Sequence, residues 1–207
     1  MTPACVRLGE KLVEAGFHVW MPLLFGKPNT IKFAGTFTSR CIYREIHLFR
    51  TNSSHPLTQW LRELTNQLNA QQGGNGVGVI GMCLTGNFAI TLIAEKTVHA
   101  AVTCQPSIPA FSACALSMTS DELVAAKESL KPLVGLRFDT DRLCPKARFD
   151  RLEDAFGANF LRHDLPGNGH GVLTGDFVDR EGHPTRKSLD FVIDYLHQRL
   201  EGYPAPK

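Results

Sequence analysis

Apolar positions along the chain alternate between two kinds of spacing. Segments in which apolar residues recur every three or four positions are typical of amphipathic helices, and they alternate with short unbroken apolar runs typical of buried strands. The helical spacing predicts helices at residues 3–15, 56–72, 84–96, 119–130 and 145–156. It also predicts a last helix that has on one face Leu189, Val192, Ile193, Leu196 and Leu200. The apolar runs predict strands at residues 17–21, 77–81, 99–103, 133–138 and 160–163.

This order of elements predicts an α/β fold. Parallel strands need a crossover that is usually a helix, so the alternation indicates a mostly parallel sheet with helices on both faces. Residues 23–54 contain glycine and proline but no sustained period, and we interpret them as mostly loop. No repeat, low-complexity tract or linker divides the chain, so residues 1–207 are expected to form a single domain.

Composition and charge narrow the class of partner. The chain is 43% hydrophobic and 20% charged, as ordinary folded proteins are. Its 22 basic and 20 acidic residues are scattered, so no basic stripe is available to track nucleic-acid phosphates. No apolar stretch approaches the roughly 18 residues of a membrane span, and the N-terminus lacks a basic region followed by an apolar core. We therefore expect a cytoplasmic protein that binds neither nucleic acid nor membrane.

The cysteines do not form a recognisable framework. The chain has six of them, at positions 5, 41, 83, 104, 114 and 144. Neither close pairs nor C-x-x-C spacing occur, which disfavours a disulfide scaffold or a zinc site, and we expect no metal or cofactor. Five are interpreted as reduced packing residues. Cys83 is the exception, because of the turn in which it lies.

Cys83 stands between a predicted strand and a predicted helix. The segment Val79–Gly86, with sequence VIGMCLTG, runs from one to the other through a turn bounded by glycines, which is the arrangement of a nucleophile elbow. Such a turn pushes the side chain at its apex out of the sheet edge. The helix that begins at Leu84 directs backbone N–H groups toward that side chain, and both effects favour a thiolate.

An acid and a histidine follow Cys83 in an order suited to catalysis. Asp141 comes just after the fourth predicted strand, and His170 lies in a glycine-rich turn after the fifth. Nucleophile, acid and histidine occur in this order in α/β-hydrolases. Asp139 is an alternative acid at the same strand end, and His163 is a weaker alternative base because it lies inside a predicted strand. Each residue alone is more often structural, but the ordered set favours a catalytic triad.

The ordered set resembles the dienelactone hydrolase family. That family carries a G-x-C-x-G-G elbow, an Asp-x-x-x-Pro segment and a Gly-His loop. Here the elbow reads GMCLTG from Gly81, the acid segment reads DRLCP from Asp141 to Pro145, and the loop is Gly169-His170. The spacing to the proline favours Asp141 as the acid. The resemblance extends over most of the chain.

The resemblance implies an α/β-hydrolase fold and a role for each site residue. Cys83 would be the nucleophile, His170 the general base and then the general acid, and Asp141 the carboxylate that orients the imidazole. The backbone N–H of Leu84 would be one oxyanion donor. The implied substrate is a small ester or lactone, hydrolysed through a thioester.

Two departures from the family pattern leave an alternative open. Thr85 replaces a glycine, and its β-branched side chain is expected to crowd the strand and helix, with Gly86 relieving the crowding. The chain also opens at the helix that in the family follows an early strand and its oxyanion loop, so we expect an N-terminally truncated fold. Met1, followed at once by a helix cap at Thr2, suggests that the true chain begins earlier. A non-catalytic protein that binds a small ligand or a partner is therefore the alternative, and a peptidase or transferase is a weaker third.

Overall fold

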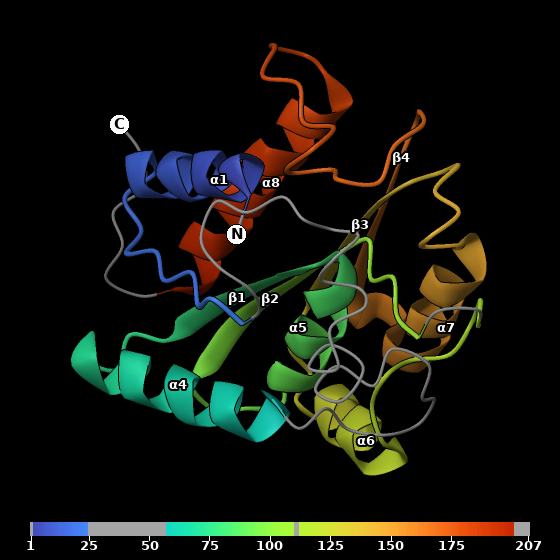
Figure 1. Ribbon diagram of the computed structural model, residues 1–207. Helices are drawn as coiled ribbons and strands as arrows, with labels where there is room; N and C mark the ends of the chain where they lie inside the picture. Colours follow the sequence, from blue (N-terminus) through green and yellow to red (C-terminus); the bar gives the residue numbers. More distant parts are fainter. Residues whose placement is uncertain (1, 25–56, 110–111, 201–207) are drawn as a thin grey trace.

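A parallel sheet forms the centre of the fold (Figure 1). The structure, a computed structural model, describes residues 2–24, 57–109 and 112–200. Within them the four strands lie in the order β1-β2-β3-β4, and each pairs in parallel with its neighbour. They are β1 (Val77–Met82), β2 (Val98–Cys104), β3 (Leu133–Phe138) and β4 (Phe160–Leu165). Because the strands are parallel, all their carboxyl ends meet at one edge, where the candidate residues also lie.

Helices cover both faces of this sheet (Figure 1). They are α1 (Pro3–Glu14), α4 (Leu57–Gln71), α5 (Gly86–Leu92), α6 (Ser120–Glu128), α7 (Lys146–Phe156) and α8 (Pro184–Arg199). Apolar residues of α1 and α8 pack on one face, while those of α5, α6 and α7 pack on the other. Helix α4 packs against α5 beside β1. None of the described helices is long and apolar enough to cross a membrane.

Local sequence signals explain where α1 and α6 begin. Thr2 caps α1 by accepting a hydrogen bond from the Cys5 N–H at 3.3 Å, and a proline opens the first turn. Thr119 and Glu122 form the expected capping box at the start of α6. The predicted parallel sheet with helices on both faces is confirmed.

Two predicted elements differ from the structure. Residues 17–21 contain neither helix nor strand, so the predicted strand there is wrong. An apolar run becomes a strand only when its backbone finds a ladder, and β1 pairs with β2 alone in the described part of the chain. The predicted helix at 84–96 is shorter, because a 3₁₀ turn at Cys83–Thr85 precedes α5 and the chain turns again before β2. The predicted loop at 23–54 lies almost wholly outside the described residues.

Candidate active site

Cys83 lies at the apex of the turn that joins β1 to α5. Its backbone has a φ of 54°, in the left-handed region that residues with a Cβ rarely adopt. The 3₁₀ turn Cys83–Thr85 follows directly, and the Ser107 N–H donates a hydrogen bond to the Cys83 carbonyl at 3.1 Å. The turn therefore has the strained geometry of the predicted elbow and is fixed by a second loop.

Two glycines make the turn sterically possible. A Cβ at Gly81 would collide with the Thr85 carbonyl oxygen, and a Cβ at Gly86 would lie 2.7 Å from the Pro106 Cα. Both contacts are with backbone, which cannot move away as a flexible side chain can. Strand, turn and the loop after β2 can thus approach closely only because these two positions lack side chains.

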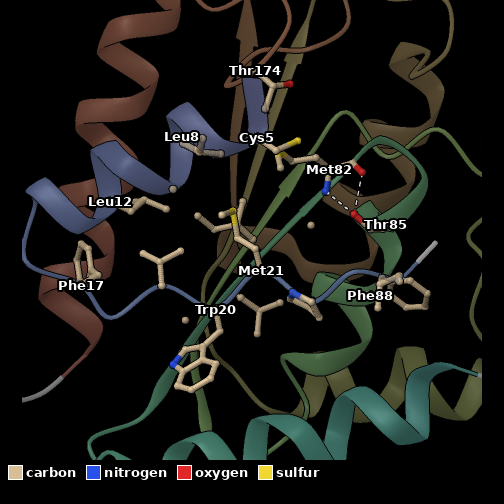
Figure 2. Close-up of a pocket in the computed structure, with 18 of the residues that line it drawn as sticks. Cys5, Leu8, Leu12, Phe17, Trp20, Met21, Met82, Thr85, Phe88 and Thr174 are labelled. Carbon is tan, nitrogen blue, oxygen red and sulfur yellow. Dashed lines mark hydrogen bonds between the residues drawn. The ribbon is translucent and has the colours of Figure 1, made fainter. Parts of the chain in front are cut away.

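Thr85 does not crowd the elbow as expected. Its hydroxyl turns back to the end of β1, where it accepts a hydrogen bond from the Met82 N–H at 3.0 Å and donates one to the Met82 carbonyl at 2.9 Å (Figure 2). A glycine could make neither hydrogen bond, so the threonine stabilises the end of the strand in this chain.

The structure brings Asp141 and His170 together. His170 Nδ1 lies 2.8 Å from Asp141 Oδ2, and the carboxylate is almost fully buried, with 1% of its side chain exposed. The other oxygen of Asp141 accepts hydrogen bonds from the N–H groups of Leu143 at 2.8 Å and Cys144 at 3.2 Å. The carboxylate is thus held in one orientation and fixes the imidazole by its Nδ1 atom.

Asp176 fixes the backbone on which His170 lies. Its Oδ2 accepts hydrogen bonds from the backbone N–H groups of His170 and Gly171, each at 2.8 Å. Nothing in the sequence pattern singled out this residue, although a carboxylate six positions after a loop histidine was an available signal. The histidine loop is therefore anchored at both its side chain and its backbone.

The alternative acid and base lie in other environments. Asp139 accepts a hydrogen bond from the Gly167 N–H at 3.2 Å and braces the loop before His170. His163 lies within β4 and its ring contacts that of Phe191 in a tilted arrangement, with ring centroids 4.3 Å apart. Burial lowers the pKa of His163. The structure therefore places Asp141 and His170, rather than Asp139 or His163, near the elbow.

Cys83 and His170 interact strongly as titrating groups. Burial alone would raise the pKa of the Cys83 thiol, but His170, Ser107 and the Leu84 N–H together lower it below its ordinary value. Burial alone would lower the pKa of His170, but Asp141 and Cys83 raise it to about 10. The pair therefore favours a thiolate beside an imidazolium. His170 Nε2 is buried and has no fully formed hydrogen bond among the described residues, and Cys83 is the neighbour through which the pKa of the ring is raised in addition to Asp141.

Two further residues near the site were not predicted from the sequence. Ser107 follows the end of β2, and its Oγ lies 3.2 Å from the Cys83 sulfur. Arg148 of α7 is almost fully buried, and it donates hydrogen bonds to the carbonyls of Pro106 at 2.7 Å, Pro109 at 2.8 Å and Ser112 at 2.5 Å. The available signal for Ser107 was its place at the carboxyl end of a strand beside the elbow. For Arg148 the chain gave none.

A cavity of about 970 Å³ opens beside Cys83 and His170. Figure 2 shows Cys5, Leu8 and Leu12 of α1 on one side of it, with Met21 and Trp20 projecting from the segment that follows. Strand β1 lines it along its whole length. Within the part of the chain that the structure describes, no three His, Cys, Asp or Glu side chains are placed to hold a metal ion.

Comparison with known protein families shows which family the chain belongs to. The model of the dienelactone hydrolase family matches residues 3–198. The chain belongs to the dienelactone hydrolase family. A search of curated proteins finds no match. Membership in this family, together with the parallel sheet and its two helical layers, gives the α/β-hydrolase fold and a hydrolase of the dienelactone hydrolase type.

Proposed function

We propose that this dienelactone hydrolase family member hydrolyses small carboxylic esters or lactones through a thioester on Cys83. The observation that carries the proposal is the arrangement of three side chains. Asp141 holds His170 by its Nδ1 atom at 2.8 Å, and the remaining nitrogen of the ring is left to serve a thiol on a strained elbow. Neighbouring groups lower the pKa of that thiol.

In the first step the Cys83 thiolate attacks the carbonyl carbon of the ester. A C–S bond forms, the carbonyl π pair moves to oxygen, and the Leu84 N–H stabilises the resulting oxyanion. When the carbonyl re-forms, the C–O bond to the alcohol breaks. His170, which already holds the proton that left the thiol, delivers it from Nε2 to the departing alkoxide.

The second step releases the acid. His170, now neutral, takes a proton from water as the hydroxyl oxygen attacks the thioester carbonyl. The C–S bond breaks, the carboxylic acid leaves, and the thiolate and imidazolium pair is restored. Asp141 keeps its charge throughout and stabilises the imidazolium, because its own pKa stays below the ordinary value: burial opposes this, but the bonds from His170, Leu143 and Cys144 outweigh it.

Replacing Cys83 tests the proposal. Cys83→Ala should lower kcat/KM for p-nitrophenyl acetate by about 10³-fold or more, because the variant lacks the thiol whose pKa His170 lowers. Cys114→Ala is the matched control, since Cys114 is exposed and does not line the cavity. Mass spectrometry of the wild-type protein quenched in acid during turnover should find the acyl group on Cys83. Equal turnover by the two variants would disprove the proposal.

A further inference from the structure

Gln105 follows β2 directly, at the edge of the sheet where the elbow lies. In the parallel register of β1 and β2, Met82 pairs with Cys104. The next residues along the two strands are Cys83 and Gln105, and neighbouring strands lie about 4.8 Å apart. Gln105 therefore follows the register position next to the nucleophile. It also lines the cavity that opens beside Cys83 and His170.

The backbone at Gln105 is strained in the same way as the backbone at Cys83. Its φ is 35°, and that of Cys83 is 54°, both in the left-handed region that residues with a Cβ rarely adopt. The Gln105 N–H donates a hydrogen bond to the Leu136 carbonyl of β3 at 2.7 Å, which holds the residue in place. Such strain persists where the surrounding structure imposes it, and it is concentrated at catalytic and ligand-binding positions. The strain therefore favours a role in the site.

The side chain of Gln105 is buried, yet its oxygen has no hydrogen-bond partner. The residue is 1% exposed, and Oε1 accepts no hydrogen bond from the described residues. A buried acceptor that is left unpaired destabilises a folded protein, so most such atoms have a partner. Among the described residues with an unpaired buried side-chain atom, Gln105 and His170 are the two that line the cavity. The amide is thus placed where a substrate can supply the missing partner.

The unpaired atom determines the kind of group that fits. An amide oxygen accepts hydrogen bonds and cannot donate them, so the complementary group must carry an O–H or an N–H. A hydrocarbon or an ether oxygen has no such proton. An ammonium group would be repelled by the imidazolium of His170, which Asp141 and Cys83 keep protonated. A neutral hydroxyl is therefore the donor that the site favours.

We propose that Gln105 determines substrate specificity by accepting a hydrogen bond from a hydroxyl on the acyl part of the substrate, at the carbon next to the ester carbonyl. The inference rests on the proposed function, because it places that carbonyl at Cys83. An ester without the hydroxyl would leave the buried Oε1 unpaired in the transition state, and the site would discriminate against it. The substrate class is then esters of α-hydroxy acids and lactones that carry an α-hydroxyl.

Phenyl esters of hydroxyacetic, methoxyacetic and propionic acid test the hydroxyl. Each kcat/KM is divided by the rate constant of the same ester with hydroxide, which removes differences in intrinsic reactivity. In the wild-type protein the hydroxyacetate should exceed each of the other two by about tenfold or more, because its O–H alone can pair with Oε1.

Three variants show whether Gln105 causes this preference. Gln105→Met keeps the length of the side chain but removes the acceptor, so the preference should disappear. Gln105→Glu keeps acceptor oxygens and should keep the preference. Gln71→Met makes the first change at an exposed residue outside the cavity lining, and its preference should equal that of the wild type.

The outcomes separate this inference from the proposed function. Good turnover of all three esters without a preference in the wild type would overturn the inference, with water serving Gln105, and would leave the proposed function standing. Equal rates for the methoxyacetate and the hydroxyacetate would also overturn it, as would a preference that survives in Gln105→Met. These wild-type comparisons do not depend on whether a variant folds.

A binding measurement decides the case in which no ester is hydrolysed and the proposed function fails. Isothermal titration calorimetry then compares the anilides of hydroxyacetic and propionic acid. A Kd for the hydroxyl compound that is lower by about tenfold in the wild type, but not in Gln105→Met, would support the role of Gln105. Equal Kd values, or no binding of either anilide, would overturn it.

Discussion

The chemistry of the site depends on the balance of charges around one sulfur atom. Burial disfavours a thiolate at Cys83, yet the neighbouring imidazolium, the Ser107 hydroxyl and the Leu84 N–H outweigh burial. At two other cysteines burial dominates. Burial raises the pKa of Cys144 to about 12 and also raises that of Cys104. The same protein thus contains a poised thiol and inert thiols, which can be compared under identical conditions.

Alkylation by iodoacetamide should reveal this difference as a function of pH. A lowered pKa means that Cys83 stays ionised as the pH falls through 8.5, the ordinary value for a thiol, so its alkylation should remain fast there. Above about pH 10 His170 loses its proton, and ester turnover should fall because no acid remains for the leaving group. Peptide mass spectrometry assigns each modified cysteine.

His170→Ala is the control for the alkylation experiment. Without the imidazolium, the effect of burial would dominate, and the pH at which Cys83 becomes reactive should move upward. Cys104 and Cys144 should stay unmodified in the folded protein at every pH tested below their raised pKa. An unchanged pH profile in His170→Ala would mean that the histidine does not ionise the thiol.

At this scale the sequence points to candidate residues but not to their arrangement. Order and spacing in the chain predict Cys83, Asp141 and His170 as a triad, and the structure places His170 Nδ1 2.8 Å from Asp141 Oδ2. For Ser107 and Asp176 the sequence held only a weak positional signal, because their contacts depend on how the loops beside the elbow fold. Thr85 shows the same limit. Its two hydrogen bonds to Met82 depend on the close turn between β1 and α5, which the sequence alone does not specify.

Among the elements, α7 connects the two loops that frame the site. Arg148 donates hydrogen bonds to the carbonyls of Pro106, Pro109 and Ser112, which lie on either side of Ser107 or shortly after it. It also donates to the Leu143 carbonyl at 3.4 Å. Because the guanidinium is buried, water could not easily take its place as the hydrogen-bond donor to these carbonyls. One side chain therefore holds the loop beside Cys83 to the loop that carries Asp141.

Arg148→Met keeps much of the length of the side chain but removes its donors. Several buried carbonyls would lose their partner, and the free energy of unfolding should fall by about 3 kcal/mol or more. Urea denaturation followed by circular dichroism measures the change. Arg151→Met, one turn further along the exposed face of the same helix, should change it by less than about 0.5 kcal/mol. Equal losses in both variants would contradict the role assigned to Arg148.

The elements themselves were predicted well where a signal is local. The spacing of apolar residues and the capping residues identified every described helix, and strand β3 has the predicted bounds. The failure at residues 17–21 has a different cause. Their β-rich composition is real, but strand formation requires a neighbour that the local sequence does not contain. The apolar residues of this segment line the cavity instead.

For the molecule as a whole, two hydrophobic layers share one sheet. Leu136 belongs to the cluster on the side of α1 and α8, and Phe149 belongs to the cluster on the side of α5, α6 and α7. Both are fully buried. Strands β2 and β3 supply side chains to both clusters. Neither layer can therefore lose its packing without disturbing the other. This arrangement predicts that the chain unfolds as the single domain expected from its sequence.

Two core substitutions test this cooperativity. Leu136→Ala and Phe149→Ala should each lower the free energy of unfolding by about 2 to 5 kcal/mol, because each leaves a cavity in a close-packed layer. In both variants the urea transitions followed by circular dichroism and by tryptophan fluorescence should coincide, with the slope of the wild type. Leu130→Ala, at a side chain that is 73% exposed, should have almost no effect. Separate transitions, each sensitive to only one of the core variants, would show instead that the two layers fold independently.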